Sequence, residues 1–151
     1  MLNEELKTKI TELLPSAAFE EGGEWVTVNI DANDLIPFAS ALRSDDLLHF
    51  DYLFCLTCID WKTHLTMVYH MDSTLFRHNI VVKAKLDIVH PGIQSVCSIW
   101  KTAEFHEREV YDLFGVKFLH HPDLRRLFLT DEWKGWPLRK DYEDPVNMIK
   151  L

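Results

Sequence analysis

The sequence predicts an α+β fold of two layers, in which helices pack on a mostly antiparallel or mixed sheet and an irregular, extended C-terminal tail follows. Three observations predict it: two helical patterns in the first 45 residues, strands joined by short polar turns over residues 50–87, and a third helical pattern ending at Phe114. The 151 residues are enough for one domain, expected over 1–118, with a partner-docking tail over 119–151 that is not an independent domain.

The first elements are two helices with a strand between them. Apolar residues recur at helical spacing over residues 3–14, and Asn3 is the expected cap of this helix. Residues 25–30 alternate apolar and polar side chains, as a strand with one buried face does. Asp31 or Asn33 then caps a second helix, whose apolar stripe ends at residue 42.

Three strands are expected next. Residues 50–59 are largely apolar in both alternating sets, which favours a central strand covered on both faces. Residues 65–71 and 79–86 follow as further strands, and the last of these has one polar face. Because the connections are short, neighbouring strands are expected to be antiparallel.

A third helix is expected from Ser95, its cap, to Phe114, with Gly115 just beyond its end. Several carboxylates on this segment could form a general acid–base pair. A solvated or salt-bridged helix face is the more usual interpretation of such pairs. The carboxylates concerned are Glu104, Glu107, Glu109 and Asp112.

The chain beyond residue 118 has neither helical nor strand periodicity. An irregular stretch of about 30 residues in a compact domain is usually functional or docked on a partner. It holds the basic pairs Arg125-Arg126 and Arg139-Lys140 together with Trp133 and Trp136, a composition typical of protein interfaces. Net charge also differs along the chain, being −7 over residues 1–100 and −1 over 101–151.

Composition argues against several functions. A net charge of −8 disfavours a nonspecific nucleic-acid or anionic-membrane binder. No apolar run approaches the ~18–20 residues that span a membrane, and the N-terminus lacks a signal-peptide pattern. Cys55 and Cys58 lie three apart in a strand and therefore point to opposite faces, which favours core packing, and Cys97 stands alone. An odd number of cysteines fits a reducing compartment.

A stand-alone metal-dependent enzyme using His106, Glu107 and His121 is the rival hypothesis. His106-Glu107 begins like a zinc-protease helix, but Val110 occupies the position of the second histidine. Glycine-rich nucleotide loops and the serine-hydrolase elbow are not found. We therefore predict no catalytic, cofactor-binding or metal-ligating residues in this chain.

Three successive segments, which begin at Glu107, His121 and Pro137, closely resemble the signature of one family. It is the C subunit (30-kDa type) of NADH-quinone oxidoreductase, respiratory complex I. Trp136 departs from the pattern, since the family often has histidine there. The residues that the resemblance assigns to a subunit interface are Glu107, Arg108, Glu109, Asp112, Gly115, His121, Pro122, Asp123, Leu124, Arg125, Arg126, Trp136, Pro137, Leu138, Arg139, Lys140 and Asp141.

The resemblance implies a non-catalytic peripheral-arm subunit of a proton-translocating NADH-quinone oxidoreductase. Such a subunit supports assembly and electron transfer from NADH to quinone by packing on the D (49-kDa type) and B subunits, with its tail extended over D. It carries no cofactor, because FMN, the iron–sulfur clusters and quinone are held by other subunits. Its membrane association, at the cytoplasmic face of the bacterial inner membrane, is only through the complex. Related subunits of membrane-bound hydrogenases and F420H2 dehydrogenase are the alternatives.

The resemblance also gives the basic residues expected roles. Arg108 is expected to satisfy carboxylates while fixing its helix against the following loop. Arg125, Arg126, Arg139 and Lys140 are expected to pair with partner acids or backbone carbonyls. Prolines at 122 and 137 would lower the entropy lost when the tail docks.

Overall fold

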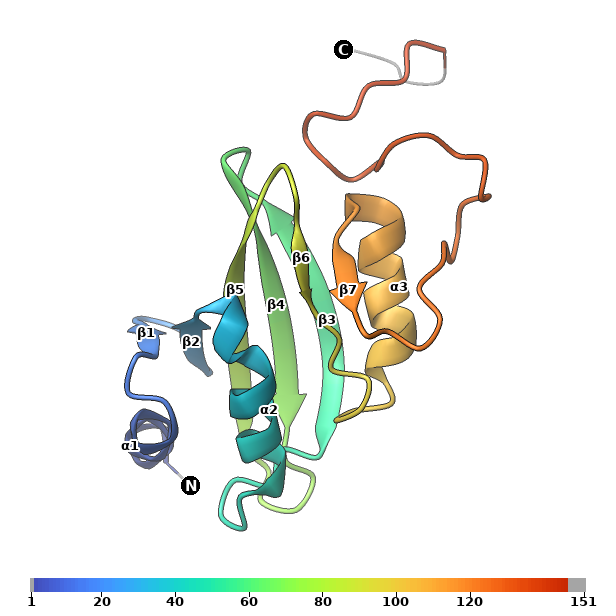
Figure 1. Cartoon of the computed structure of the whole chain (residues 1–151). Coiled ribbons are helices and arrows are strands. Elements are labelled where there is room, and N and C mark those ends of the chain that lie inside the picture. The colour runs from blue at the N-terminus through green and yellow to red at the C-terminus, as the bar shows by residue number, and fades with distance from the viewer. Residues whose placement is uncertain (1, 147–151) are drawn as a thin grey trace.

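The computed structural model describes residues 2–146, so the end of the predicted tail, residues 147–151, lies outside the described residues. In chain order the elements are α1 (Asn3–Leu13), β1 (Ala18–Glu20), β2 (Val26–Ile30), a 3-10 turn (Ala32–Asp34), α2 (Leu35–Ser44), β3 (Tyr52–Asp60), β4 (His64–Asp72), β5 (Asn79–Asp87), β6 (Gly92–Gln94), α3 (Ala103–Phe114) and β7 (Lys117–Leu119) (Figure 1). The predicted α+β class is confirmed. The division into a domain over 1–118 and a docking tail stays a prediction.

The main sheet is mixed, with strands in the order β1-β2-β5-β4-β3. The predicted antiparallel meander is confirmed, since β3 pairs with β4 and β4 with β5 in antiparallel register. β2 instead runs parallel to β5, with Val28 opposite Val82. β1 was not expected, and it adds to the outer side of β2.

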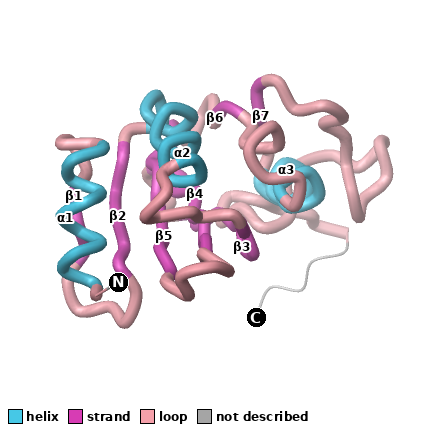
Figure 2. Tube along the Cα trace, turned by 90° about the horizontal axis from the view of Figure 1, so that it is seen from below, coloured by secondary structure: helices cyan, strands magenta, loops and turns pink. Residues whose placement is uncertain are grey.

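The prediction that the strand over residues 50–59 is central was wrong. β3 is the last strand in the order, and α3 lies alongside it (Figures 1 and 2). Leu53 and Leu56 are both buried in the core although they belong to different alternating sets, because a register shift between Leu53 and Cys55 brings them to the same face. Phe54 instead packs edge-on against Trp25 and His70, with ring centroids 6.0 and 5.8 Å away. Apolar residues in both alternating sets predicted a central strand. Part of that pattern comes instead from aromatic side chains that pack outside the core.

The helices cover one face of the sheet and share one core with it. Leu6 of α1, Leu42 of α2 and Val110 of α3 belong to the same buried cluster as the inward residues of the strands. Val68 and Val81 are buried outside that cluster. Among the described residues, no helix is long and apolar enough to cross a membrane.

The third helix begins eight residues later than predicted, at Ala103 rather than Ser95. β6 and a turn precede it, and β6 pairs in parallel with β7 in a separate two-stranded sheet. Ser95 does not cap the helix, because its hydroxyl donates to Oε1 of Glu107 instead. Because β6 and β7 are paired, the segment that follows α3 lies beside the segment that precedes it. Residues before, within and after the helix are thereby brought together.

Candidate functional site

Asp112 on α3 is fully buried and binds the tail through the main chain. Its Oδ2 accepts hydrogen bonds from the backbone N–H groups of Leu127, Phe128 and Leu129 at 3.2, 2.7 and 3.1 Å. Its Oδ1 accepts from Nη1 of Arg126 at 3.1 Å. Burial opposes ionisation, but these donors hold the pKa of Asp112 below its ordinary value. Of the two predicted alternatives, a solvated or a salt-bridged helix face, Asp112 is salt-bridged, but its side chain is buried rather than on the surface.

Arg126 joins the helix to a more distant part of the tail. Beyond its ion pair with Asp112, its Nη2 donates to the carbonyl oxygens of Trp133 and Gly135, both at 3.0 Å. Its guanidinium carbon lies 4.4 Å from the ring centroid of Trp136, a cation–π distance. Arg126 was expected to pair with partner acids or with backbone carbonyls. It bonds to backbone carbonyls, and these carbonyls belong to this chain.

Arg108 also contacts the tail backbone. Its Nε donates to the carbonyl of Arg125 at 3.1 Å, and its Nη2 donates to the carbonyl of Arg126 at 2.9 Å. Arg108 was expected to bind carboxylates, but in both of these bonds its partner is a backbone carbonyl. The bonds do fix the helix against the following loop, as expected. Because Arg108 is buried, its bonds to two carbonyls also satisfy tail acceptors away from water.

The Trp136 ring packs directly against Gly115, where a side chain on residue 115 would collide with it. Gly115 ends α3 with a φ of +78°, and a Cβ at this position would lie 2.6 Å from the Trp136 ring. Tyr111, one turn earlier, packs against the same ring at a centroid distance of 5.4 Å. The tryptophan that departs from the family pattern is thus a packed part of the tail's attachment.

Gly115→Ala is expected to lower the free energy of unfolding by about 2–4 kcal/mol, because it adds a clash with Trp136 to the cost of a left-handed conformation. Urea unfolding measures the loss. Gly22→Ala is the matched control, since Gly22 has a φ of +86° with nothing within 4 Å of its added Cβ. Equal losses in the two variants would contradict the role assigned to Trp136.

Residues 138–140 are bonded to α3 and to one end of the sheet. That end lies opposite the β4–β5 turn. The N–H of Lys140 donates to Oδ2 of Asp60 at 2.9 Å, and the N–H of Leu138 donates to the carbonyl of Leu113 at 3.0 Å. The Arg139 guanidinium donates to the carbonyl of Ile88. Burial opposes ionisation of Asp60, but backbone donors from residues 140 and 62 hold its pKa below the ordinary value.

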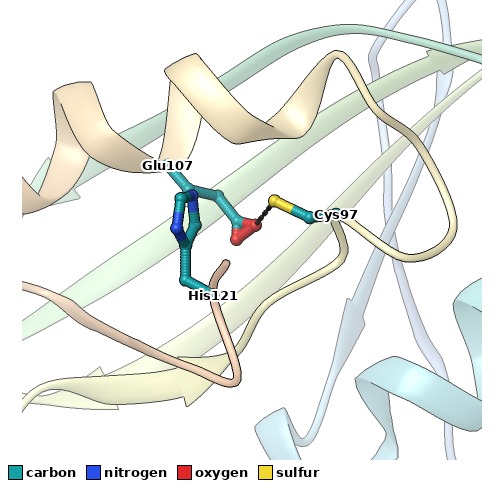
Figure 3. Close-up of side chains that lie close together, drawn as sticks. All are labelled: Cys97, Glu107 and His121. Carbon is teal, nitrogen blue, oxygen red and sulfur yellow. Dashed lines mark hydrogen bonds between the residues drawn. The ribbon is translucent and has the colours of Figure 1, made fainter. Parts of the chain in front are cut away.

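Glu107 is buried in a different contact. Its Oε1 accepts from the Ser95 hydroxyl at 2.7 Å, the Val96 N–H at 3.1 Å and the Cys97 thiol at 3.2 Å. Burial raises its pKa to about 7. Among the described residues, the group able to hold a metal ion consists of Cys97, Glu107 and His121 (Figure 3). His106, named in the metal-enzyme hypothesis, is not part of it.

Residues 28–146 match the family described as "Respiratory-chain NADH dehydrogenase, 30 Kd subunit". The chain belongs to this family. The C/D subunit of NADH-quinone oxidoreductase from Phocaeicola vulgatus is 50% identical over 105 residues, which cover 68% of this chain and 20% of the relative. The C subunit of the same enzyme from Chloroherpeton thalassium is 44% identical over 117 residues, covering 76% and 48%. The chain thus spans about a fifth and about half of these relatives.

Two solved structures show the fold of this 30-kDa-type subunit. A chain of the archaeal membrane-bound sulfane sulfur reductase, a respiratory membrane complex, superposes with a TM-score of 0.80 and covers 93% of this chain and 85% of its own length. A trypsin-resistant fragment of Nqo5 superposes with a TM-score of 0.67, covering 80% and 98%. Both are 24% identical to this chain, so the likeness concerns the fold.

The residues assigned to a subunit interface divide into two groups in this 30-kDa-type subunit. The group with buried side chains, which includes Arg108, Asp112 and the side chain of Arg126, attaches the tail to the domain. The exposed group includes Leu138 and the ion pair of Asp123 with Arg125. Sequence reasoning missed Phe128, an exposed aromatic whose N–H is bound by Asp112. The interface assignment itself stays a prediction.

Proposed function

We propose that this chain is a peripheral-arm subunit that does no redox chemistry itself and supports assembly and electron transfer of NADH-quinone oxidoreductase by docking its tail on the D subunit, beside B. The observation that carries the proposal is an irregular tail held in place by buried charges of α3 while large apolar side chains face outward. The Phocaeicola relative is named as a C/D subunit, which supports D as the partner.

The exposed apolar residues of the tail are the expected anchors. Phe128 is 66% exposed and Leu138 is 54% exposed, although the N–H of each is bonded to α3. A backbone already fixed in this way loses little conformational entropy on binding, which raises affinity. Aromatic residues and arginine are enriched at the centres of protein interfaces, which makes Phe128 the stronger of the two anchors. The pair Phe128 and Leu138 is called the tail anchors below.

The proposal extends to cofactors and location. FMN, iron–sulfur clusters and quinone would be held by the other subunits, and this chain would reach the cytoplasmic face of the membrane through the complex. A cofactor-free role is compatible with a polar network whose bonds run between the helix and the tail. In that network Arg108 and Asp112 are engaged in fixing the backbone.

Substitution of the tail anchors tests the docking. After co-expression with the D and B subunits, Phe128→Asp is expected to weaken retention on D by about 30-fold, the effect of losing an interface anchor worth about 2 kcal/mol. Leu138→Asp is expected to act in the same direction. Affinity is measured by titrating labelled D–B subcomplex with each purified variant.

Leu75→Asp is the matched control for these variants. Leu75 is 64% exposed, and it lies in the β4–β5 turn, at the other end of the sheet from the tail (Figure 1). It is expected to leave the affinity unchanged. If both tail-anchor variants bind D with the affinity of Leu75→Asp, the docking proposal is wrong.

A further inference from the structure

Three potential metal ligands converge from three segments of the chain. Cys97 lies in the turn after β6, Glu107 lies on α3, and His121 follows β7. Their ligand atoms all lie within 4.8 Å of one another. In Figure 3 the Glu107 carboxylate lies between the thiol and the imidazole. The parallel pairing of β6 with β7 produces this arrangement, because it places the first and last segments side by side.

One oxygen of this cluster lacks a partner. The Glu107 side chain is 0% exposed, and its Oε1 accepts three hydrogen bonds, whereas the buried Oε2 has none. Leaving a buried polar atom unpaired is unfavourable, and more so when the group is charged. A cation in contact with Oε2 would remove that cost.

The donor set selects a kind of cation. A thiolate, an imidazole nitrogen and a carboxylate oxygen are the ligand types of Zn²⁺, whereas Mg²⁺ and Ca²⁺ prefer oxygen ligands. Cys97 and His121 are half-buried, so an ion can reach the cluster from solvent. Zinc is therefore the ion that this set of side chains favours.

Both ring nitrogens of His121 are hydrogen-bonded to the backbone in this structure. One ring nitrogen bonds to the carbonyl of Glu104 at 3.0 Å, and the other accepts from the N–H of Asp123 at 2.9 Å. Binding an ion through one nitrogen replaces one of these bonds, and the other remains to orient the ring. A second hydrogen bond of this kind is usual for metal-bound histidine.

We propose that Cys97, Glu107 and His121 form a site for a single zinc ion, with water in the fourth position. The Cys97 thiol releases its proton to solvent as its sulfur binds the metal. The bound ion joins the start of the tail to α3 and to the turn after β6. This site is independent of docking on the D subunit.

Zinc titration of the full chain tests the site. ZnCl2 is added in competition with a chromophoric chelator, and one ion per chain is expected to bind. Cys97→Ser, Glu107→Gln and His121→Gln are each expected to lower affinity by at least about 100-fold, because even outer-sphere changes cost about 10–100-fold. Co²⁺ in place of zinc is expected to give a thiolate-to-metal charge-transfer band, which requires no variant.

Two matched controls separate this site from other ligands. Cys55→Ser and His106→Gln remove a half-buried cysteine and a half-buried histidine outside the cluster, and both are expected to leave affinity unchanged. Circular dichroism checks that each variant is folded. The proposal is overturned if zinc binds at far less than one ion per chain. It is also overturned if the cobalt protein lacks the charge-transfer band, or if folded His121→Gln binds zinc as tightly as His106→Gln.

Discussion

Asp112→Asn is expected to lower the free energy of unfolding by about 3–5 kcal/mol, the cost of leaving a buried charge without its partner. The side chain accepts three backbone N–H groups on one oxygen and the Arg126 guanidinium on the other. An asparagine would have to turn its NH2 group toward one of these two sets of donors. Either orientation leaves buried N–H groups unsatisfied and Arg126 without a counter-charge.

Urea unfolding of the full chain measures this loss. Asp123→Asn is the matched control within the same network, because Asp123 pairs with Arg125 at the surface, where the side chains are 49% and 66% exposed. Its loss is expected to stay below about 1 kcal/mol, as is usual for exposed pairs. Similar losses in the two variants would show that Asp112 does not hold the tail.

The dependence on pH gives a second measurement on the same variant. Since the folded-state pKa of Asp112 is lowered, its stabilising contribution is fully present above the unfolded-state pKa. The contribution is lost as pH falls through the folded-state pKa. The wild-type chain is thus expected to lose this stability from about pH 5 downward. The difference in unfolding free energy between wild type and Asp112→Asn should shrink over that range, and a constant difference would contradict the assignment.

Arg126→Lys is expected to cost about 2–4 kcal/mol and to loosen the tail, although it keeps the charge. The guanidinium donates at once to Asp112 and to the carbonyls of Trp133 and Gly135 while it packs on Trp136. A lysine ammonium is a compact point charge without the planar fork that these positions require. We therefore expect the bonds to residues 133 and 135 to be lost first.

Limited trypsin digestion measures the loosening at Lys134, which lies between those two carbonyls. Cleavage there, followed by mass spectrometry, is expected to accelerate at least about 10-fold in Arg126→Lys, because proteolysis tracks local opening. The substitution does not alter the number of trypsin sites. Arg125→Lys is the matched control, since Arg125 is exposed and its side chain bonds to Asp123. Equal cleavage of the two variants would contradict the role of Arg126.

The parts of the fold that follow from local periodicity could be predicted from the sequence. The helices α1 and α2 and the meander β3–β4–β5 were expected within a few residues of their bounds, because residues 3.6 or 2 apart share a face within one segment. The strands β1, β6 and β7 have three residues each, too few for a period to show. The helix start was wrong because Ser95, a good cap, bonds to Glu107 instead.

The burial of charges in the candidate site could not be predicted in the same way. Asp112 and Arg108 have the spacing of an ordinary solvated helix face, and they are buried because an irregular segment 14–18 residues later supplies their partners. No periodic signal identifies such a segment. The resemblance indicated which residues belong together and placed Arg108 against the following loop, but it assigned no bond to Asp112 and expected Arg126 to pair with partner acids or backbone carbonyls.

The bonds by which α3 holds the tail also determine which substitutions the tail can accept. Asp112 binds the N–H groups of residues 127–129, and Arg108 binds the carbonyls of residues 125 and 126, so these bonds depend on the main chain rather than on the side chains there. Every amino acid except proline supplies the N–H group that these bonds require at positions 127–129, and the exposed position 128 places the fewest demands on its side chain. The outward side chains are therefore free to diversify to suit a new partner while the scaffold beneath them remains the same.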